Sequence, residues 1–142
     1  MERPRRDLRK HTDLAGSARA ADMIRSQPLG AFRQVIIPVG DVGAAVAFYS
    51  ALLGLSVKFQ DADRWAALDA GTLTVALAGL PEQPAEGAIA LGIKVSDVNV
   101  ALRDICAAGG TVLSEPRDGS HERRGACRDC HGTPLALYSP LG

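Results

Sequence analysis

An internal repeat is the feature of this sequence that most constrains how the chain can fold. The segment Val39-Gly40-Asp41-Val42 recurs as Val95-Ser96-Asp97-Val98, 56 positions later in a chain of 142 residues. The same offset relates Ala45, Ala51 and Gly54 to Ala101, Ala107 and Gly110. A repeat of this length is typical of one supersecondary unit that is built more than once, because a single unit cannot bury its own hydrophobic face. The sequence therefore predicts two similar units that pack together.

Hydrophobic periodicity predicts the same order of elements in both units. The first unit has a strand at residues 35–39, a helix at 42–53, and strands at 55–59, 65–68 and 73–77. Asp41 is expected to cap the helix and Gly54 to end it. After a polar linker at 81–87, the second unit has a strand at 89–95, a helix at 98–108 capped by Asp97 and ended by Gly109-Gly110, and a strand at 111–114. Gly71-Thr72 matches Gly132-Thr133 at a larger offset of 61, which predicts a longer loop near residues 115–124.

These elements predict an α+β fold in which two tandem βαβββ units form a curved, roughly eight-stranded mixed sheet around a cavity, with the helices outside. The repeat units span about residues 32–80 and 88–140, within a domain of residues 29–142. Residues 1–28 are expected to be a flexible basic tail, because they are rich in arginine and poor in apolar residues until Met23. A basic docking arm and a true start at Met23 are the alternative interpretations.

Bulk properties narrow the range of partners and compartments. The 16 Lys and Arg residues balance the 16 Asp and Glu residues, so the charge favours neither nucleic acid nor an anionic membrane as a partner. The pair Arg5-Arg6 is not followed by the apolar segment of a secretion signal. Three cysteines at irregular spacing do not predict a disulfide framework. We therefore expect a cytoplasmic protein.

Three stretches carry a resemblance to a known superfamily. The first runs from Val39 into the Phe48-Tyr49 pair and on to Leu53-Gly54, and the second is its repeat over residues 95–110. The third is the turn and strand at residues 128–138. In order and spacing the chain resembles the glyoxalase/bleomycin-resistance protein/dioxygenase (vicinal oxygen chelate) superfamily over roughly residues 32–140. The resemblance implies the fold predicted above.

The resemblance also identifies where a metal would be held. Metal-dependent members of the superfamily place His, Glu or Gln at four strand positions that face the cavity. Here these positions fall on Gln34, Ala76, Ala90 and Ala136. Alanine offers no lone pair to a divalent cation, so only Gln34 remains as a donor. We therefore expect no metal and no other cofactor.

A second motif, Cys127-Arg128-Asp129-Cys130-His131, spells the pattern of covalent haem attachment. The chain has no export signal for an apocytochrome, and the motif overlaps the tight turn before the last strand. Zinc held by Cys127, Cys130, His131 and His121 is a chemically plausible alternative. The favoured interpretation is a polar turn that contains cysteines by chance.

Strand alternation assigns the side chains that would line the cavity. If Gln34 faces inward, so do Ile36 and Pro38, and the same parity applies to the other strands. Small side chains dominate this face, which predicts a roomy cavity with Phe59 and Trp65 as flat walls. Arg64, Arg124 and Arg128 could meet an anionic or carbonyl-rich ligand, and the alternative is that they are solvated surface residues. The expected ligand-binding residues are Gln34, Ile36, Pro38, Phe59, Trp65, Ala76, Ala90, Arg128, Ala136 and Tyr138.

A large apolar cavity without metal ligands or an evident catalytic base favours binding over catalysis. By resemblance to the bleomycin-resistance proteins, we expect a metal-free protein that binds a hydrophobic or aromatic small molecule, including an antibiotic. The alternatives are a metal-dependent glyoxalase-like lyase or isomerase or an extradiol-type dioxygenase, and a regulatory module that acts through the basic tail. We also expect a homodimer, because an open sheet leaves unpaired edges. Pro38, which donates no ladder hydrogen bond, is typical of an edge or crossover position.

Overall fold

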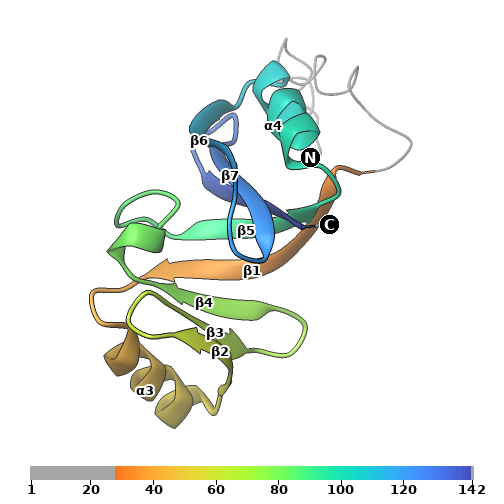
Figure 1. The fold of residues 1–142 in the computed structure, drawn as a ribbon. Helices are drawn as coiled ribbons and strands as arrows, with labels where there is room; N and C mark the ends of the chain where they lie inside the picture. The colour runs from red at the N-terminus through yellow and green to blue at the C-terminus, as the bar shows by residue number, and fades with distance from the viewer. Residues whose placement is uncertain (1–27, 142) are drawn as a thin grey trace, which may run out of the picture.

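The computed structural model describes residues 28–141 and places eight strands in one mixed, open and curved sheet (Figure 1). The order across the sheet is β2-β3-β4-β1-β5-β8-β7-β6. In chain order the elements are β1 (Gly30–Pro38), α3 (Val42–Leu53), β2 (Ser56–Asp61), β3 (Trp65–Asp69), β4 (Thr74–Ala78), η1 (Leu80–Glu82), β5 (Ala90–Val95), α4 (Val98–Ala107), β6 (Thr111–Asp118), β7 (Glu122–Arg128) and β8 (Pro134–Pro140).

The two halves of the sheet have the same connectivity, as the repeat predicts. β1 runs parallel to β4, and β5 runs parallel to β8, so the first and last strands of each βαβββ unit are neighbours. The units join through an antiparallel pair between β1 and β5. Helix α3 packs on the half that contains β2, β3 and β4, and α4 packs on the half that contains β6, β7 and β8 (Figure 1). The predicted fold class is confirmed.

Each helix begins and ends where the sequence predicts, or within one residue of it. The Asp41 carboxylate accepts a hydrogen bond of 2.9 Å from the Ala44 amide, and Asp97 accepts one of 3.0 Å from Val100. These side chains satisfy backbone donors that lack a partner in the first turn of a helix. Gly54 ends α3 in the left-handed conformation, with φ of 68°. The duplicated Asp therefore marks the same strand-to-helix junction in both units.

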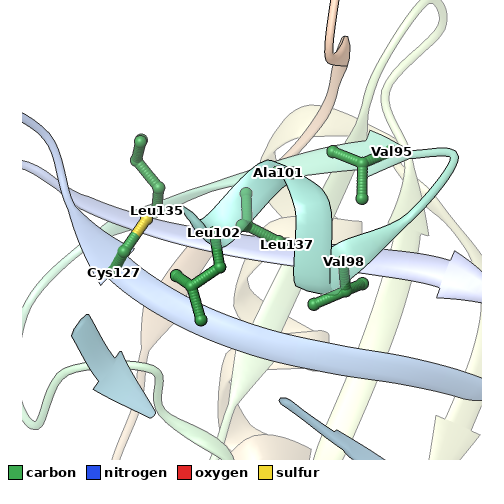
Figure 2. Packing of buried hydrophobic residues seen from close by; sticks show 7 residues of the cluster. All are labelled: Val95, Val98, Ala101, Leu102, Cys127, Leu135 and Leu137. Atoms are coloured by element: carbon green, nitrogen blue, oxygen red, sulfur yellow. The ribbon is translucent and has the colours of Figure 1, made fainter. Parts of the chain in front are cut away.

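Consecutive residues on the central strands face opposite sides of the sheet. Ile37 and Leu77 pack beneath α3, whereas their neighbours Ile36 and Ala76 belong to a separate apolar cluster on the other face. Beneath α4 lies a third cluster, in which the side chains of the helix meet those of β5, β7 and β8 (Figure 2). Its buried members are Val95, Val98, Ala101, Leu102, Cys127, Leu135 and Leu137. The helices thus cover one face, and the opposite face is left for the cleft.

Two predictions about the strands are wrong. The longer loop expected at residues 115–124 is a hairpin, because β6 continues to Asp118 and β7 begins at Glu122. Of the two positions predicted for Pro38, edge or crossover, the edge is wrong, since β1 lies at the centre of the sheet between β4 and β5. Pro38 is the last residue of β1, and the antiparallel pairing with β5 ends at Ile36, so its missing N–H breaks no ladder there.

The Cys127 thiol is fully buried beneath α4, and this burial predicts a dependence of stability on pH. Burial first, and then the charges of Cys106 and Asp129, raise the pKa of Cys127 from 9.0 to about 11. Because the pKa is higher in the folded state, the contribution of this thiol to stability is complete below pH 9 and is lost as the pH rises toward 11. Urea unfolding of wild type and Cys127→Ala at pH 8 and pH 10.5 should show a larger loss of stability for the wild type. Equal losses would contradict the burial of this thiol.

No helix within residues 28–141 has both the length and the apolar character that a membrane crossing requires. The predicted basic tail at residues 1–28 lies outside the described residues, apart from Pro28.

Candidate ligand-binding cleft

An open cleft of about 720 Å³ lies on the face of the sheet opposite the helices, and a smaller pocket of about 90 Å³ adjoins it. The two share side chains from both halves of the sheet and from the linker between them. The shared residues are Gln34, Trp65, Glu82, Glu122, Arg124 and Tyr138. Because these residues come from β1, β3, η1, β7 and β8, the cleft exists only when both repeat units are in place.

The floor of the cleft is apolar and made of small side chains. Ile36, Ala76, Ala78 and Ala90 form one buried cluster, each at most 2% exposed. Trp65 and Ala136 pack against this cluster and also line the smaller pocket, so they form the layer that a ligand would touch. An apolar or aromatic group that covers this floor removes apolar surface from water, which favours binding.

Gln34 places an amide group on this floor, and a glycine on the neighbouring strand makes room for its side chain. A Cβ placed on Gly92 of β5 would lie 2.3 Å from Cγ of Gln34 and 2.9 Å from its Nε2. The Gln34 side chain therefore lies flat across Gly92 and presents its amide to the cleft, where it forms no hydrogen bond with another residue of the described chain.

The four positions that correspond to metal ligands in the superfamily do not form a metal site here. Ile36 is opposite Ala76 of β4 on one side and opposite Ala90 of β5 on the other. Its side chain is 2% exposed and fills the space between the two alanines. Ala136 lies opposite Gly92 in the next strand pair and adds no donor. Three alanines and a central isoleucine do not fit a divalent cation, whatever Gln34 contributes.

A charged rim stands above the apolar floor. Glu82, from η1 in the linker, accepts hydrogen bonds from Arg64 of the first unit and from Arg124 of the second, the latter at 3.2 Å to Nη1. The Glu82 side chain is only 11% exposed, so this double ion pair is partly shielded from solvent. Glu82 therefore ties the two halves together across one end of the cleft.

Tyr138 places a phenol on the wall of the cleft, next to Glu122. Burial, and secondarily the negative charge of Glu122, raise the pKa of Tyr138, while Arg33 acts weakly in the opposite direction. The phenol is therefore protonated near neutral pH and can donate a hydrogen bond to a ligand.

The structure brings most of the predicted ligand-binding residues together. Gln34, Ile36, Trp65, Ala136 and Tyr138 line the smaller pocket, and Phe59 lines the larger cleft. Ala76 and Ala90 face the same way but are fully buried beneath this surface. Two predicted residues lie apart from it. Pro38 ends β1 without lining either cavity, and Arg128 donates from Nη1 to the Gly132 carbonyl in the turn before β8.

Sequence reasoning missed Glu82, and it considered Arg64 and Arg124 as contacts for an anionic ligand without including them among the expected ligand-binding residues. Glu82 falls in the predicted polar linker, and Arg124 falls in the predicted loop. Arg64 precedes β3 and belongs to no predicted element. No local pattern predicted that Glu82 would lie between these two arginines.

The cysteine motif forms a turn and brings no metal ligands together. Asp129 accepts hydrogen bonds from the amides of His131 at 2.8 Å and Thr133 at 3.0 Å, and these bonds lower the pKa of its carboxyl. Cys127 points into the core, whereas Cys130 is exposed. Across residues 28–141 no three His, Cys, Asp or Glu side chains are grouped as a metal site. The hydrogen bonds of Asp129 confirm the tight polar turn that was predicted before the last strand.

Comparison with known families identifies the family of this chain. The model of the glyoxalase-like domain matches residues 34–138, which includes both repeat units. This chain belongs to the glyoxalase-like domain family. A relative from Mycolicibacterium smegmatis, an uncharacterized protein, is 39% identical over 109 residues, which are 77% of this chain and 93% of the relative.

Several solved structures share the fold of this glyoxalase-like protein. Methylmalonyl-CoA epimerase from Mycobacterium tuberculosis is 20% identical, with a TM-score of 0.64 over 86% of this chain and 96% of the epimerase. The Streptomyces coelicolor methylmalonyl-CoA epimerase, solved with 2-nitronate-propionyl-CoA, is 27% identical, with a TM-score of 0.63 over 81% of this chain and 100% of the epimerase. A glyoxalase/bleomycin resistance protein/dioxygenase superfamily member from Vibrio splendidus is 16% identical, with a TM-score of 0.57 over 77% and 99% of the two chains.

Proposed function

We propose that this glyoxalase-like protein binds a hydrophobic or aromatic small molecule in its cleft without a metal, and sequesters it as the bleomycin-resistance proteins do with antibiotics. The observation that carries this proposal is the replacement of the metal-ligand positions by a packed apolar floor. Ala76 and Ala90 flank Ile36, and all three are buried together. Such a floor favours an apolar ligand and gives a divalent cation no coordination.

The size of the cleft and the types of residue around it support the same proposal. A volume of about 720 Å³ lies within the range of sites that take drug-sized molecules, roughly 300–1,000 Å³. Trp65 and Phe59 offer flat aromatic surfaces, while Gln34 and Tyr138 offer polar groups that can orient a ligand. This combination of an apolar surface with a few polar groups is typical of binding sites.

A thermal-shift screen against aromatic and hydrophobic natural products, antibiotics included, tests the proposal directly. A ligand that binds the folded state raises the melting temperature by mass action. The ligand should also change the fluorescence of Trp65, the only tryptophan of the chain. Trp65→Ala should reduce the shift, whereas Phe32→Ala, which removes an exposed aromatic of β1 that lines neither cavity, should not. Catalytic turnover that persists after chelation and dialysis would overturn the proposal.

Gln34→Ala provides a specific prediction about metals. Because Gln34 is the only remaining donor of the four positions, we expect wild type and Gln34→Ala to respond identically to Zn²⁺, Mn²⁺ and Ni²⁺ in thermal-shift measurements. A metal-dependent stabilisation of more than about 1 kcal/mol in the wild type that is lost in the variant would refute the metal-free proposal.

A metal-dependent isomerase is the second candidate, and the resemblance to solved methylmalonyl-CoA epimerases favours it. It requires ligands other than those at the four expected positions. Elemental analysis of protein purified without chelators separates the candidates, since one divalent ion per chain would support the isomerase.

We further propose that the protein acts as a homodimer in the cytoplasm. Strands β2 and β6 are the open edges of the sheet, and the outer side of α3 exposes Phe48 and Leu52 at 56% and 66%. Free cysteines at positions 106, 127 and 130 fit a reducing compartment. Light scattering should give about twice the chain mass of 14.9 kDa. A monomer at high micromolar concentration with unchanged ligand affinity would exclude the dimer.

A further inference from the structure

Three arginines lie at one end of the cleft, and within residues 28–141 only one carboxylate, that of Glu82, forms ion pairs with them. Arg117 of β6 lies opposite Arg124 of β7 in the strand pair, and both line the smaller pocket. Like charges placed directly opposite each other on a sheet are destabilising. Arg64 approaches the same place from the first unit. Arg64 and Arg124 therefore meet on Glu82 at one end of the cleft, and the exposed Arg117 of the edge strand faces Arg124.

The nearby acceptors do not satisfy these three groups. Both oxygens of Glu82 are engaged, one by Arg64 and the other by Arg124. Within residues 28–141, Arg117 forms no ion pair, and Nε of Arg124 is buried without an acceptor. Glu122, the other carboxylate of the smaller pocket, forms no ion pair there and lies beside Tyr138. An anion would give the buried Nε of Arg124 an acceptor and would pair with the exposed Arg117 side chain.

The side chains of Arg117 and Arg124 lie next to the apolar floor. The pocket that contains Arg117 and Arg124 is also lined by Ile36, Trp65 and Ala136. A ligand that covers this floor therefore extends toward the arginines. Because guanidinium groups bind paired oxygens in a fork geometry, the matching group is an oxyanion such as a carboxylate or a phosphate ester.

We propose that Arg117 and Arg124, with Arg64, form a subsite for the oxyanion of an amphipathic ligand whose aromatic body covers the Trp65 floor. This inference rests on the proposed binding function and specifies its ligand class. Glu82 competes with the ligand for Arg64 and Arg124, so it sets the strength of the subsite. Arg124 also has a structural role through Glu82, which makes Arg117 the better position for a test.

Calorimetric titration with three matched probes tests the subsite: 2-naphthoate, 2-naphthyl phosphate and neutral 2-naphthamide. The wild type should bind at least one of the two anions about tenfold more tightly than the amide, and this preference should weaken at high salt. The anion that binds more tightly identifies the kind of oxyanion. In Arg117→Gln the preference should fall below about threefold, while the affinity for the amide stays unchanged. Arg103→Gln, which removes an arginine that is 73% exposed on α4, is the matched control and should behave as wild type.

Glu82→Gln distinguishes the subsite from a purely structural ion-pair cluster. Removing the competing carboxylate should raise the ratio of the affinity for the preferred anion to the affinity for the amide by about fivefold. A structural role predicts an equal loss for all probes. Equal binding of acids and amide by the wild type would overturn the subsite while leaving the proposed binding function intact. If no naphthalene binds, the subsite is also overturned, and the natural-product screen alone then decides the proposed function.

Discussion

Restoring metal ligands at the floor of the cleft should convert this protein into one that binds a divalent cation. The variant combines Ile36→Gly, Ala76→Glu, Ala90→His and Ala136→Glu and keeps Gln34. Ile36 is flanked by Ala76 and Ala90 on neighbouring strands, and Gly92 is flanked by Gln34 and Ala136. Two carboxylates, an imidazole and an amide would then surround the space that the Ile36 side chain fills.

The metal-free variant should be much less stable than the wild type. Two carboxylates placed on a buried floor cost about 1–3 kcal/mol each when they lack partners, and the loss of the Ile36 side chain adds a cavity. Metal binding satisfies both carboxylates, so addition of Zn²⁺ or Co²⁺ should restore most of the lost melting temperature.

Equilibrium dialysis followed by elemental analysis should find one ion per chain of the variant and none in the wild type. The three ligand substitutions without Ile36→Gly are the control, and they should bind metal at least tenfold more weakly because the isoleucine still occupies the centre. A folded variant that takes up no metal would show that the four positions do not converge as the strand register indicates.

The sequence predicted the parts of the fold that depend on local patterns. The repeated Asp41 and Asp97 identified both helix starts, because a capping carboxylate acts on amides only three residues away. Strand alternation placed Gln34, Ile36 and Ala136 on the cleft face, because the side-chain period of a strand is two wherever the strand lies in the sheet.

The rest of the site depends on contacts that no local pattern contains. Glu82 meets Arg124 across 42 positions of sequence, and only the packed sheet brings them together. Strand β7 begins Glu122-Arg123-Arg124, which has no hydrophobic alternation to contradict the longer loop that the larger repeat offset predicts there. These residues form a strand because β6 and β8 pair with them on both sides, so tertiary pairing overrides their weak intrinsic preference.

Two neighbouring residues of β8 should separate the stability of the fold from the function of the cleft. Both residues border the smaller pocket, but the Leu137 side chain is fully buried in the cluster beneath α4, whereas the half-buried Ala136 packs on the floor of the cleft. Leu137→Ala should reduce the free energy of unfolding by about 2–5 kcal/mol, because it removes buried methyl groups and leaves a cavity. That is a large part of the roughly 5–15 kcal/mol that a domain of this size has in total. Urea unfolding with an unchanged m-value would measure it.

Ala136→Leu should have the opposite profile. The larger side chain projects into the cleft, where there is room for it, so the free energy of unfolding should change by less than about 1 kcal/mol. It occupies space above the floor beside Trp65, so the affinity for an aromatic ligand should fall at least tenfold. If Ala136→Leu destabilised the protein as much as Leu137→Ala does, Ala136 would belong to the packed core. The cleft would then lack the floor on which both the proposed function and the oxyanion subsite depend.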